Sequence, residues 1–584
     1  MEFTRRDLLK FTGGSAAGLM LTPAPWGLLR DSALVSETWP GVPRPAGGEI
    51  SIRYTTCTLC PAGCGVRARC VNNQPVSLAG VPGQPTGAGA LCPIGLLGHH
   101  FRFCGNRAHA RLANGRVASL ESALAGVSAA IRSCGPRESV AILDPQPGRV
   151  ASLIYRRFLA GLPNGIHCTP SGSQPFGPFG IDLENTRAVV SFGVPVLDGW
   201  LSPGRVLANR GHFQLIQVEA AYSRTASLAD LWAPVLPGNE RDFADAVIRA
   251  MHGGAADPSA AKTAAILLRN GPAIAIGGPA ADKLNAELGS FGRSGGFLAR
   301  RDYMAVTDIA QVPDGAVRVL FIEERTNSQD IAWDDLRRKL GPDAVVVALT
   351  PWLDGIARHA DYVIPAPMYL ESLDEAPTPD GSTVASFSLS PALLAAPANL
   401  ISPADFFLRV QHSNSTYSDV IKGRVAAIKK DGGGVIYTYA DGKSAAVRDV
   451  ADIWKNMLAG AIWMDTAGAR PMGTRRTAES QAARPAPTPT TEFPLLLLAA
   501  DSPPARGTPL MSKLYRESGL RQSTGAAAIN PKTGRDQGLQ DGCRATIKTP
   551  DATVTVQVVF DPAVMPGAVQ MAGQACSAAS IRRI

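Results

Sequence analysis

Four cysteines in the first hundred residues constrain the fold of this chain more than any other feature. Cys57, Cys60 and Cys64 lie close together, and Cys92 follows them in the pattern C-x2-C-x3-C-x27-C. Such thiols can form disulfides, bind a zinc ion or hold an iron–sulfur cluster. Each possibility would fix the local backbone and would indicate a different function.

An iron–sulfur cluster fits this spacing best. Disulfide scaffolds serve small domains that lack a core, whereas this chain has 584 residues. Zinc sites usually pair two C-x2-C knuckles, and here three thiols share one run. A cubane needs one thiolate per iron, and Pro61, Gly63 and Gly65 allow a bent loop that presents three of them. Disulfides and zinc remain the alternatives.

The N-terminal segment resembles a twin-arginine export signal. Arg5 and Arg6 precede two leucines and a lysine, and a weakly apolar stretch follows at residues 11–21. That stretch is too short to be a resident membrane span. The resemblance implies export of the folded protein, with its cofactor, to the periplasm or the outer face of the cytoplasmic membrane. The alternative is an ordinary amphipathic helix.

Composition argues against nucleic acid as a partner. The formal net charge of +8 is small for this length, and no Lys/Arg run with interleaved aromatic residues occurs. No run of eighteen apolar residues occurs either, so we expect no transmembrane segment in the mature form.

Strands that alternate with helices predict an α/β fold with parallel sheets and ligands at the carboxyl ends of their strands. "ESVAILD" at 138–144 and the start of "TRAVVSFGVPVLDGW" at 186–200 have the apolar character of buried strands. Alternating apolar and polar residues near the C-terminus predict a small β-barrel. The expected parts are a signal (1–35), an iron–sulfur domain (48–106), two α/β halves (107–255 and 256–415), a variable region with a linker (416–490) and the barrel (491–584).

The cysteine pattern, followed by Pro93 and Gly95, resembles the N-terminal cluster domain of the molybdopterin oxidoreductases. This family includes formate dehydrogenases, periplasmic nitrate reductases and polysulfide reductases. The resemblance implies one [4Fe-4S] cluster on Cys57, Cys60, Cys64 and Cys92. It also implies a bis(molybdopterin guanine dinucleotide) cofactor with molybdenum or tungsten, and dinucleotide-binding-like α/β domains.

Further blocks resemble the pterin-binding segments of that family, although each is altered at a polar position. A Gly-Val-Pro turn, the block that begins at Glu219, and a Pro-Gly-Asn-Glu turn lie in the expected first α/β half. An Asn-Pro and an Asp-Gly pair correspond to the C-terminal domain. By this resemblance the residues that contact a pterin dinucleotide are Gly193, Glu219, Arg224, Gly238, Asn239, Asn530 and Gly542.

Cys168 is the candidate protein ligand for molybdenum or tungsten, because the family places that ligand in the loop before the first dinucleotide block. A thiolate suits a soft metal, and Ser171 is a weaker candidate. The alternative is a buried, inert thiol. Ile94 stands where many relatives have a lysine between cluster and pterin, so that positive charge is missing.

Two functions follow from the resemblance. The chain is either a molybdopterin-dependent oxidoreductase that carries electrons in a respiratory complex, or a metal-free scaffold and electron-transfer subunit. The second kind occurs in menaquinone reductase and in alternative complex III. The expected partners are a ferredoxin-like iron–sulfur subunit, a membrane quinone-binding subunit and a multihaem cytochrome c.

Overall fold

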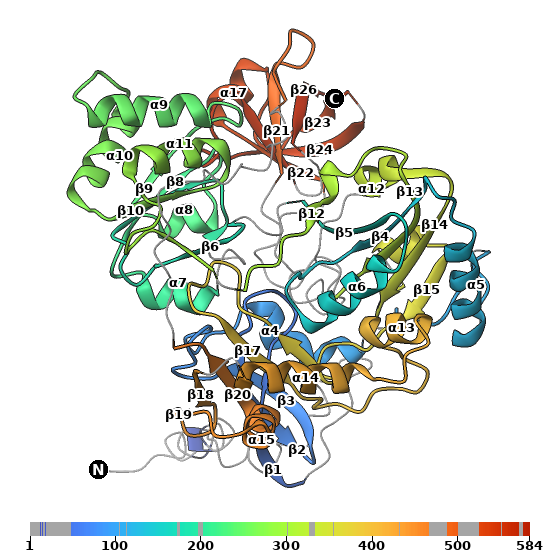
Figure 1. The fold of residues 1–584 in the computed structure, drawn as a ribbon. Helices are drawn as coiled ribbons and strands as arrows, with labels where there is room; N and C mark the ends of the chain where they lie inside the picture. Colours follow the sequence, from blue (N-terminus) through green and yellow to red (C-terminus); the bar gives the residue numbers. More distant parts are fainter. Residues whose placement is uncertain are drawn as a thin grey trace.

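A computed structural model gives the fold (Figure 1). It describes residues 12, 14, 15, 18 and 48–584, except 104–105, 113, 172–175, 197–201, 301, 326–332, 354, 431–432, 467–486, 500–524, 551 and 572–575. Most of the expected export signal therefore lies outside the described residues. No described helix is long and apolar enough to cross a membrane.

The chain begins with a three-stranded antiparallel sheet in the order β1-β2-β3. Thr56 pairs with Gly65, so the last residue of β1 lies beside the first residue of β2. Because of this register, the loop between them starts and ends at the same edge of the sheet. The elements are β1 (Ile50–Thr56), β2 (Gly65–Val71), β3 (Gln74–Gly80), α4 (Pro93–Leu97) and η1 (Gly98–Phe103).

A six-stranded parallel sheet in the order β12-β5-β4-β13-β14-β15 forms the largest layer. Its central strands β4 and β13 are buried except at Arg318, as expected for apolar runs covered by helices on both faces. The elements are α5 (Leu120–Arg132), β4 (Ser139–Leu143), α6 (Val150–Ala160), β5 (Gly165–Thr169), β12 (Thr307–Asp308), β13 (Val317–Glu323), α12 (Trp333–Lys339), β14 (Leu340–Thr350) and β15 (Tyr362–Pro365).

A second parallel sheet, in the order β10-β7-β8-β9, has α9, α10 and α11 packed beside it at one end of the molecule (Figure 1). A short antiparallel pair, β11-β6, accompanies it. The elements are β6 (Phe179–Ile181), β7 (Ala188–Phe192), α7 (Pro203–Asn209), β8 (Gln214–Val218), α8 (Arg224–Leu228), β9 (Leu231–Ala233), α9 (Glu240–Met251), α10 (Pro258–Arg269), β10 (Ala273–Ile276), α11 (Gly278–Leu288) and β11 (Phe297–Ala299).

The two sheets do not coincide with the expected halves 107–255 and 256–415. The four-stranded sheet is inserted between β5 and β12 of the six-stranded sheet. The expected boundary at 255/256 falls between α9 and α10, whose apolar faces share one core beside the four-stranded sheet. The sequence could not locate this insertion, because strands of both sheets have the same apolar pattern and pairing is decided in space.

A five-stranded antiparallel sheet, β16-β17-β20-β18-β19, lies beside the cluster domain. It uses residues up to Met464, so much of the expected variable region 416–490 is folded, and part of the expected linker lies outside the described residues. The elements are β16 (Asp374–Ala376), β17 (Ser386–Ser390), α13 (Pro403–Val410), α14 (Tyr417–Lys430), β18 (Val435–Thr438), β19 (Lys443–Ala446), α15 (Val450–Gly460) and β20 (Ala461–Met464).

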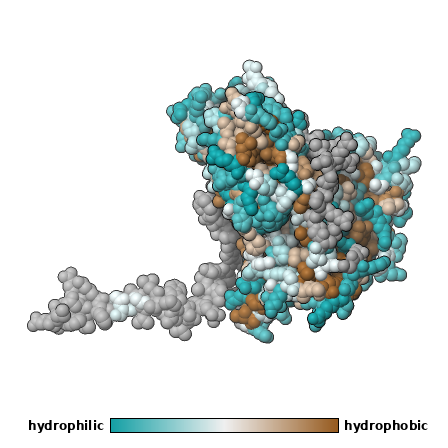
Figure 2. Space-filling model, turned by 60° about the vertical axis from the view of Figure 1, so that its left-hand side comes forward, coloured by the Kyte–Doolittle hydropathy of each residue, from teal (hydrophilic) through white to brown (hydrophobic). Residues whose placement is uncertain are grey.

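The predicted C-terminal β-barrel is confirmed. Six strands close in the order β21-β25-β22-β24-β23-β26 around an apolar interior. On the face of the molecule shown in Figure 2, apolar side chains form separate patches among hydrophilic ones. The barrel elements are β21 (Leu495–Ala499), β22 (Ala526–Ile529), α17 (Pro531–Asp536), β23 (Arg544–Lys548), β24 (Thr553–Phe560), β25 (Ala568–Met571) and β26 (Ser577–Arg583).

Candidate iron–sulfur site and the adjacent cavity

The fold gathers the four predicted cluster cysteines around one loop. The β1–β2 turn carries Cys57, Cys60 and Cys64, and the Cys57 amide donates to the Cys64 carbonyl at 2.8 Å. Cys92 comes from the start of α4, where its Sγ accepts the Gly95 amide at 3.4 Å. Every described cysteine, these four included, is a free thiol.

The loop depends on residues without side chains. Gly63 has φ +57°, a left-handed conformation that costs other residues about 1 kcal/mol or more. A Cβ on Gly87 would lie 3.2 Å from the Cys64 backbone, and a Cβ on Gly95 would lie 3.8 Å from Cys57 Sγ. Gly87 therefore permits close backbone packing against Cys64, whereas the distance at Gly95 is an ordinary van der Waals contact, and Gly63 provides the bend expected of it.

Burial and mutual repulsion raise the pKa of three of these thiols, those of the β1–β2 turn. Burial, followed by the neighbouring thiols, raises the pKa of Cys57 well above its usual value and that of Cys60 to about 12. Burial raises the pKa of Cys64 to about 11, although the Ser202 hydroxyl, 3.7 Å from its Sγ, opposes the shift. Four thiolates gathered around one loop, two of them buried, would need a strongly positive partner, and the irons of a cubane would supply one.

The donor set therefore fits a [4Fe-4S] cluster. Among the described residues, no three His, Cys, Asp or Glu side chains converge closely enough to bind a single metal ion. A cubane spreads its four thiolates over four separate irons, so it requires wider spacing than one zinc ion does.

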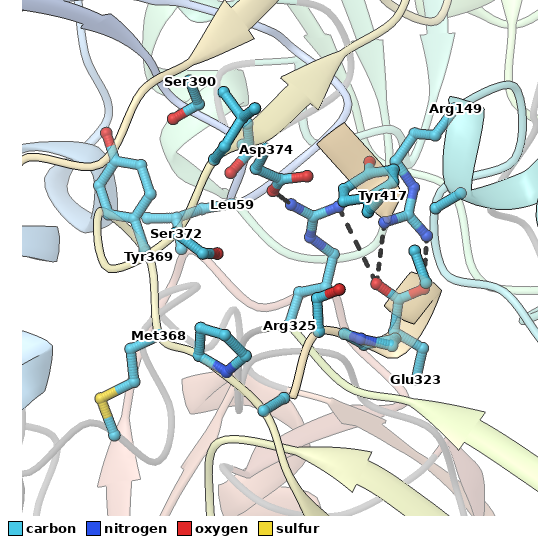
Figure 3. A pocket seen from close by; sticks show the side chains of 18 of the residues that line it. Leu59, Arg149, Glu323, Arg325, Met368, Tyr369, Ser372, Asp374, Ser390 and Tyr417 are labelled. Carbon is cyan, nitrogen blue, oxygen red and sulfur yellow. Dashed lines mark hydrogen bonds and ion pairs between the residues drawn. The ribbon is translucent and has the colours of Figure 1, made fainter. Parts of the chain in front are cut away.

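A cavity of about 70 Å³ lies directly beside the cluster loop (Figure 3). Thr58 and Leu59 line one side, and Glu323 and Arg325 from the end of β13 line another. Tyr369 lines it as well, and burial, together with the Cys57 thiol, raises the pKa of its hydroxyl well above the usual value. The cavity has room for only a few water molecules.

Buried charges fill the space at the carboxyl ends of β4 and β13. Arg149 donates to both Glu323 oxygens, at 2.8 and 2.5 Å, and to Asp144 Oδ1 at 2.8 Å. Ser152 and His167 complete the bonds of Asp144, at 2.6 and 3.1 Å. Burial alone would raise the pKa of Asp144, but Arg149 and His167 hold it well below its usual range.

A second buried carboxylate lies next to this network. Glu375 Oε1 accepts the Val150 amide at 2.7 Å and the Tyr417 hydroxyl at 3.0 Å. Burial, and then repulsion by Asp374, raises the pKa of Glu375 to about 7. Parallel α/β sheets normally bind ligands at the carboxyl ends of their strands. Here the chain's own side chains occupy much of that position.

Cys168 does not face this cavity. Cys168 lies in β5, which pairs with β4 on one side and with β12 on the other. Its side chain packs in an apolar core. The Sγ donates to the Ile142 carbonyl at 3.3 Å, and burial raises the pKa of the thiol well above its usual value. Ser171, the weaker candidate, donates to Asp308 at 2.7 Å. Cys168 thus has the environment of a structural thiol.

Three of the predicted pterin-contacting residues near the four-stranded sheet form hydrogen bonds within the chain. Gly193 and Glu219 follow β7 and β8, and the Gly193 amide donates to Val218 at 3.0 Å. Glu219 accepts from Ser223 and from Gln217 Nε2. The Gly238 amide donates to Glu240 at 2.7 Å. Arg224 begins α8, and Asn239 precedes α9 without a side-chain cap bond.

The barrel residues are also engaged internally. Asn530 donates to Val564 at 2.8 Å and accepts the Lys532 amide at 2.9 Å, and the Gly542 amide donates to Val558 at 2.9 Å. The barrel sits directly on the loop after β8, because the Met565 amide donates to Ala220 at 2.8 Å. Asn530 and Gly542, like the charged network and Cys168, are therefore engaged in bonds within the chain, whereas the four-thiol loop fits the cluster.

Sequence reasoning missed the charged network. Its signal was present in "AILD" and "FIEER", where apolar strands end directly in acidic residues. Such endings indicate charges at the carboxyl edge of a buried sheet. What could not be inferred was their partner, because Arg149 lies 174 residues from Glu323 in the sequence.

Comparison with known proteins agrees with this site. Residues 50–101 match the Molybdopterin oxidoreductase Fe4S4 domain. The chain is 24% identical, over 98% of its length and 93% of the relative's, to "Menaquinone reductase, molybdopterin-binding-like subunit" of Nitratidesulfovibrio vulgaris (strain Hildenborough).

Among solved structures, acetylene hydratase from Pelobacter acetylenicus matches with a TM-score of 0.61 and 13% identity, over 89% of this chain and 92% of that one. This likeness concerns the fold. The resemblance predicted from the cysteine spacing is thereby confirmed for residues 50–101, which are similar to the Fe4S4 domain of molybdopterin oxidoreductases.

Proposed function

We propose that this protein is an exported [4Fe-4S] electron-transfer subunit of a quinone-linked respiratory complex, without a molybdenum or tungsten catalytic centre of its own. Cys57, Cys60, Cys64 and Cys92 would hold the cluster. The buried thiols, their close-packed glycines and the matched Fe4S4 domain support this assignment.

The ion network of Arg149 is the observation that supports the proposed absence of a molybdenum or tungsten centre. Its guanidinium is fully enclosed between Asp144 and Glu323, at the sheet edge where an α/β fold binds its ligand. Buried charges are tolerated when their partners are in place, and here the chain supplies all of them. The ion pairs of Arg149 are thus closed within the chain, although the nearby Gln146 Oε1 and His167 Nδ1 are buried without a hydrogen-bond partner among the described residues.

An iron–sulfur cluster accepts and releases one electron at a time. Around it, the residues of this chain would shield the site and adjust its charge. The Ser202 hydroxyl and the Gly95 amide are placed to bond to ligand sulfurs, which stabilises anionic sulfur. Leu59, Ile94 and Phe101 belong to the apolar cluster that surrounds the thiols and limits water.

The relative and the N-terminal sequence support the proposed partners and location. The relative is named as a subunit of menaquinone reductase, which supports a multi-subunit, quinone-linked assembly. The proposed partners are a membrane quinone-binding subunit, a ferredoxin-like iron–sulfur subunit and a multihaem cytochrome c. Residues 1–35 would direct export through the twin-arginine pathway, which places the complex at the periplasmic face.

Metal analysis of the protein purified anaerobically from its native host tests this proposal. We expect about four irons per chain and neither molybdenum nor tungsten. Cys60→Ala should lose most of the iron, whereas Cys70→Ala, a buried cysteine outside the pattern, should keep it. Stoichiometric molybdenum or tungsten would contradict the absence of a catalytic metal. Unchanged iron in Cys60→Ala, or no iron in the wild type, would contradict the cluster.

A further inference from the structure

The cluster loop has a cationic neighbour that comes from a distant part of the sequence. Ile94, two residues after Cys92, is buried in the apolar cluster around the thiols and supplies no charge. Arg325 follows β13 by two residues and lines the same cavity as Thr58 and Leu59, the two residues between Cys57 and Cys60.

Arg325 is held in place by ion pairs. Its side chain, 12% exposed, contacts the Asp374 carboxylate and lies 4.0 Å from Glu323 (Figure 3). Asp374 begins β16, which also borders the cluster loop, because a Cβ on Gly63 would lie 3.5 Å from the Ala376 Cβ. One cation and one anion therefore approach the loop from two different strands.

We propose that the Arg325–Asp374 pair sets the reduction potential of the cluster, with Arg325 raising it and Asp374 lowering it. Reduction adds one negative charge to the site. In a region of low dielectric constant, a nearby cation stabilises that charge and a nearby anion destabilises it. The proposal rests on the proposed function, because it requires the cluster to be present.

The surroundings of Arg325 support this role. The buried side chains of Leu59 and Tyr369 line the same cavity as its guanidinium, so little water is present there to screen the charge. The charge therefore acts at short range on the loop that holds Cys57 and Cys60, and it comes from a residue that follows β13.

A redox titration of the full-length, anaerobically purified protein tests the proposal, with the cluster signal followed by electron paramagnetic resonance. Arg325→Met should lower the equilibrium constant for reduction about tenfold, which is 59 mV for a one-electron couple. Asp374→Asn should shift the potential upward, and Arg325→Lys should stay near the wild type because it keeps the charge.

Lys339→Met is the matched control. Lys339 is 10% exposed and pairs with Asp314 at 2.6 Å, but it lies just before β14, at the amino end of the same sheet. Its substitution should leave the potential unchanged. A shift of equal size in this variant would show that Arg325→Met acts through general loss of charge or stability.

Opposite shifts in Arg325→Met and Asp374→Asn would support the proposal. Equal potentials in all variants, or shifts in the same direction, would overturn it and leave the cluster assignment intact. If Arg325→Met does not retain iron, the test rests on Asp374→Asn alone. The proposal then requires that the cluster potential of Asp374→Asn is higher than that of the wild type. A wild-type protein without a cluster would instead refute the proposed function, which metal analysis shows separately.

Discussion

Arg149 and Glu323 form a double ion pair in the interior of the protein, with Nη1 2.8 Å from Oε1 and Nη2 2.5 Å from Oε2. Arg149 precedes α6 and Glu323 ends β13, so the pair ties a helix start to the centre of the six-stranded sheet. The arginine also holds Asp144, which follows β4. Three elements therefore depend on one guanidinium.

Arg149→Met should destabilise the protein by about 3–5 kcal/mol, because it leaves two buried carboxylates without their cation. Urea denaturation at pH 7 measures the loss. Arg157→Met, on an exposed position of α6, serves as the control and should change stability by no more than about 0.5 kcal/mol. A similar small effect in both variants would show that the network contributes little.

The same network predicts an acid dependence. The pKa of Asp144 is depressed, so its stabilising contribution is present above the unfolded pKa of about 4 and is lost as the pH falls through the folded pKa. The deficit of Arg149→Met should therefore shrink when urea curves are measured below about pH 4. A deficit that stays constant with pH would argue against the pairing.

Glu375 predicts a pH dependence of opposite sign. Its pKa is raised to about 7, so the folded state keeps a proton that the unfolded state loses above about 4.5. Stability from this group falls by about 1.4 kcal/mol per pH unit as the pH rises through that window.

Glu375→Gln keeps an acceptor for Val150 and Tyr417 and removes the titration. Its stability relative to the wild type should therefore increase between pH 5 and pH 7, as measured by urea midpoints. Glu121→Gln, an exposed change on α5, should follow the wild type at each pH. Parallel curves for Glu375→Gln and the wild type would exclude the raised pKa.

Gly63→Ala should weaken the cluster loop, because φ +57° disfavours a side chain by about 1 kcal/mol or more. We expect faster loss of the cluster to a chelator and a lower denaturation midpoint. Gly423→Ala is the contrasting variant: it lies inside α14 with open space around it, so it should stabilise by about 0.5–1 kcal/mol. Unchanged cluster lifetime in Gly63→Ala would contradict the predicted strain.

Cys168 should behave as a core thiol. In native protein treated with an alkylating reagent, exposed Cys576 should be modified while Cys168 reacts only after unfolding. Cys168→Ser should keep the iron content, because the hydroxyl can donate to the Ile142 carbonyl as the thiol does. Rapid labelling of Cys168 in the native protein, or loss of a bound metal in Cys168→Ser, would instead support Cys168 as a metal ligand.

Local sequence was sufficient for the features that depend on near neighbours. The spacing of Cys57, Cys60 and Cys64 predicted a tight thiol loop, because a short loop with Gly63 has few conformations that present three side chains to one side. The alternating pattern near the C-terminus predicted the barrel, since a closed sheet with one buried face imposes that alternation.

Only the tertiary structure decided how distant segments meet. The apolar pattern of β10 does not show that it pairs with β7 rather than with a strand of the larger sheet. Cys168 has the residue type of a metal ligand, but its position inside β5 buries it in the core. Arg149 finds Glu323, and Arg325 reaches the cluster loop, because charges excluded from water are stable only beside a partner, and that partner is fixed by packing.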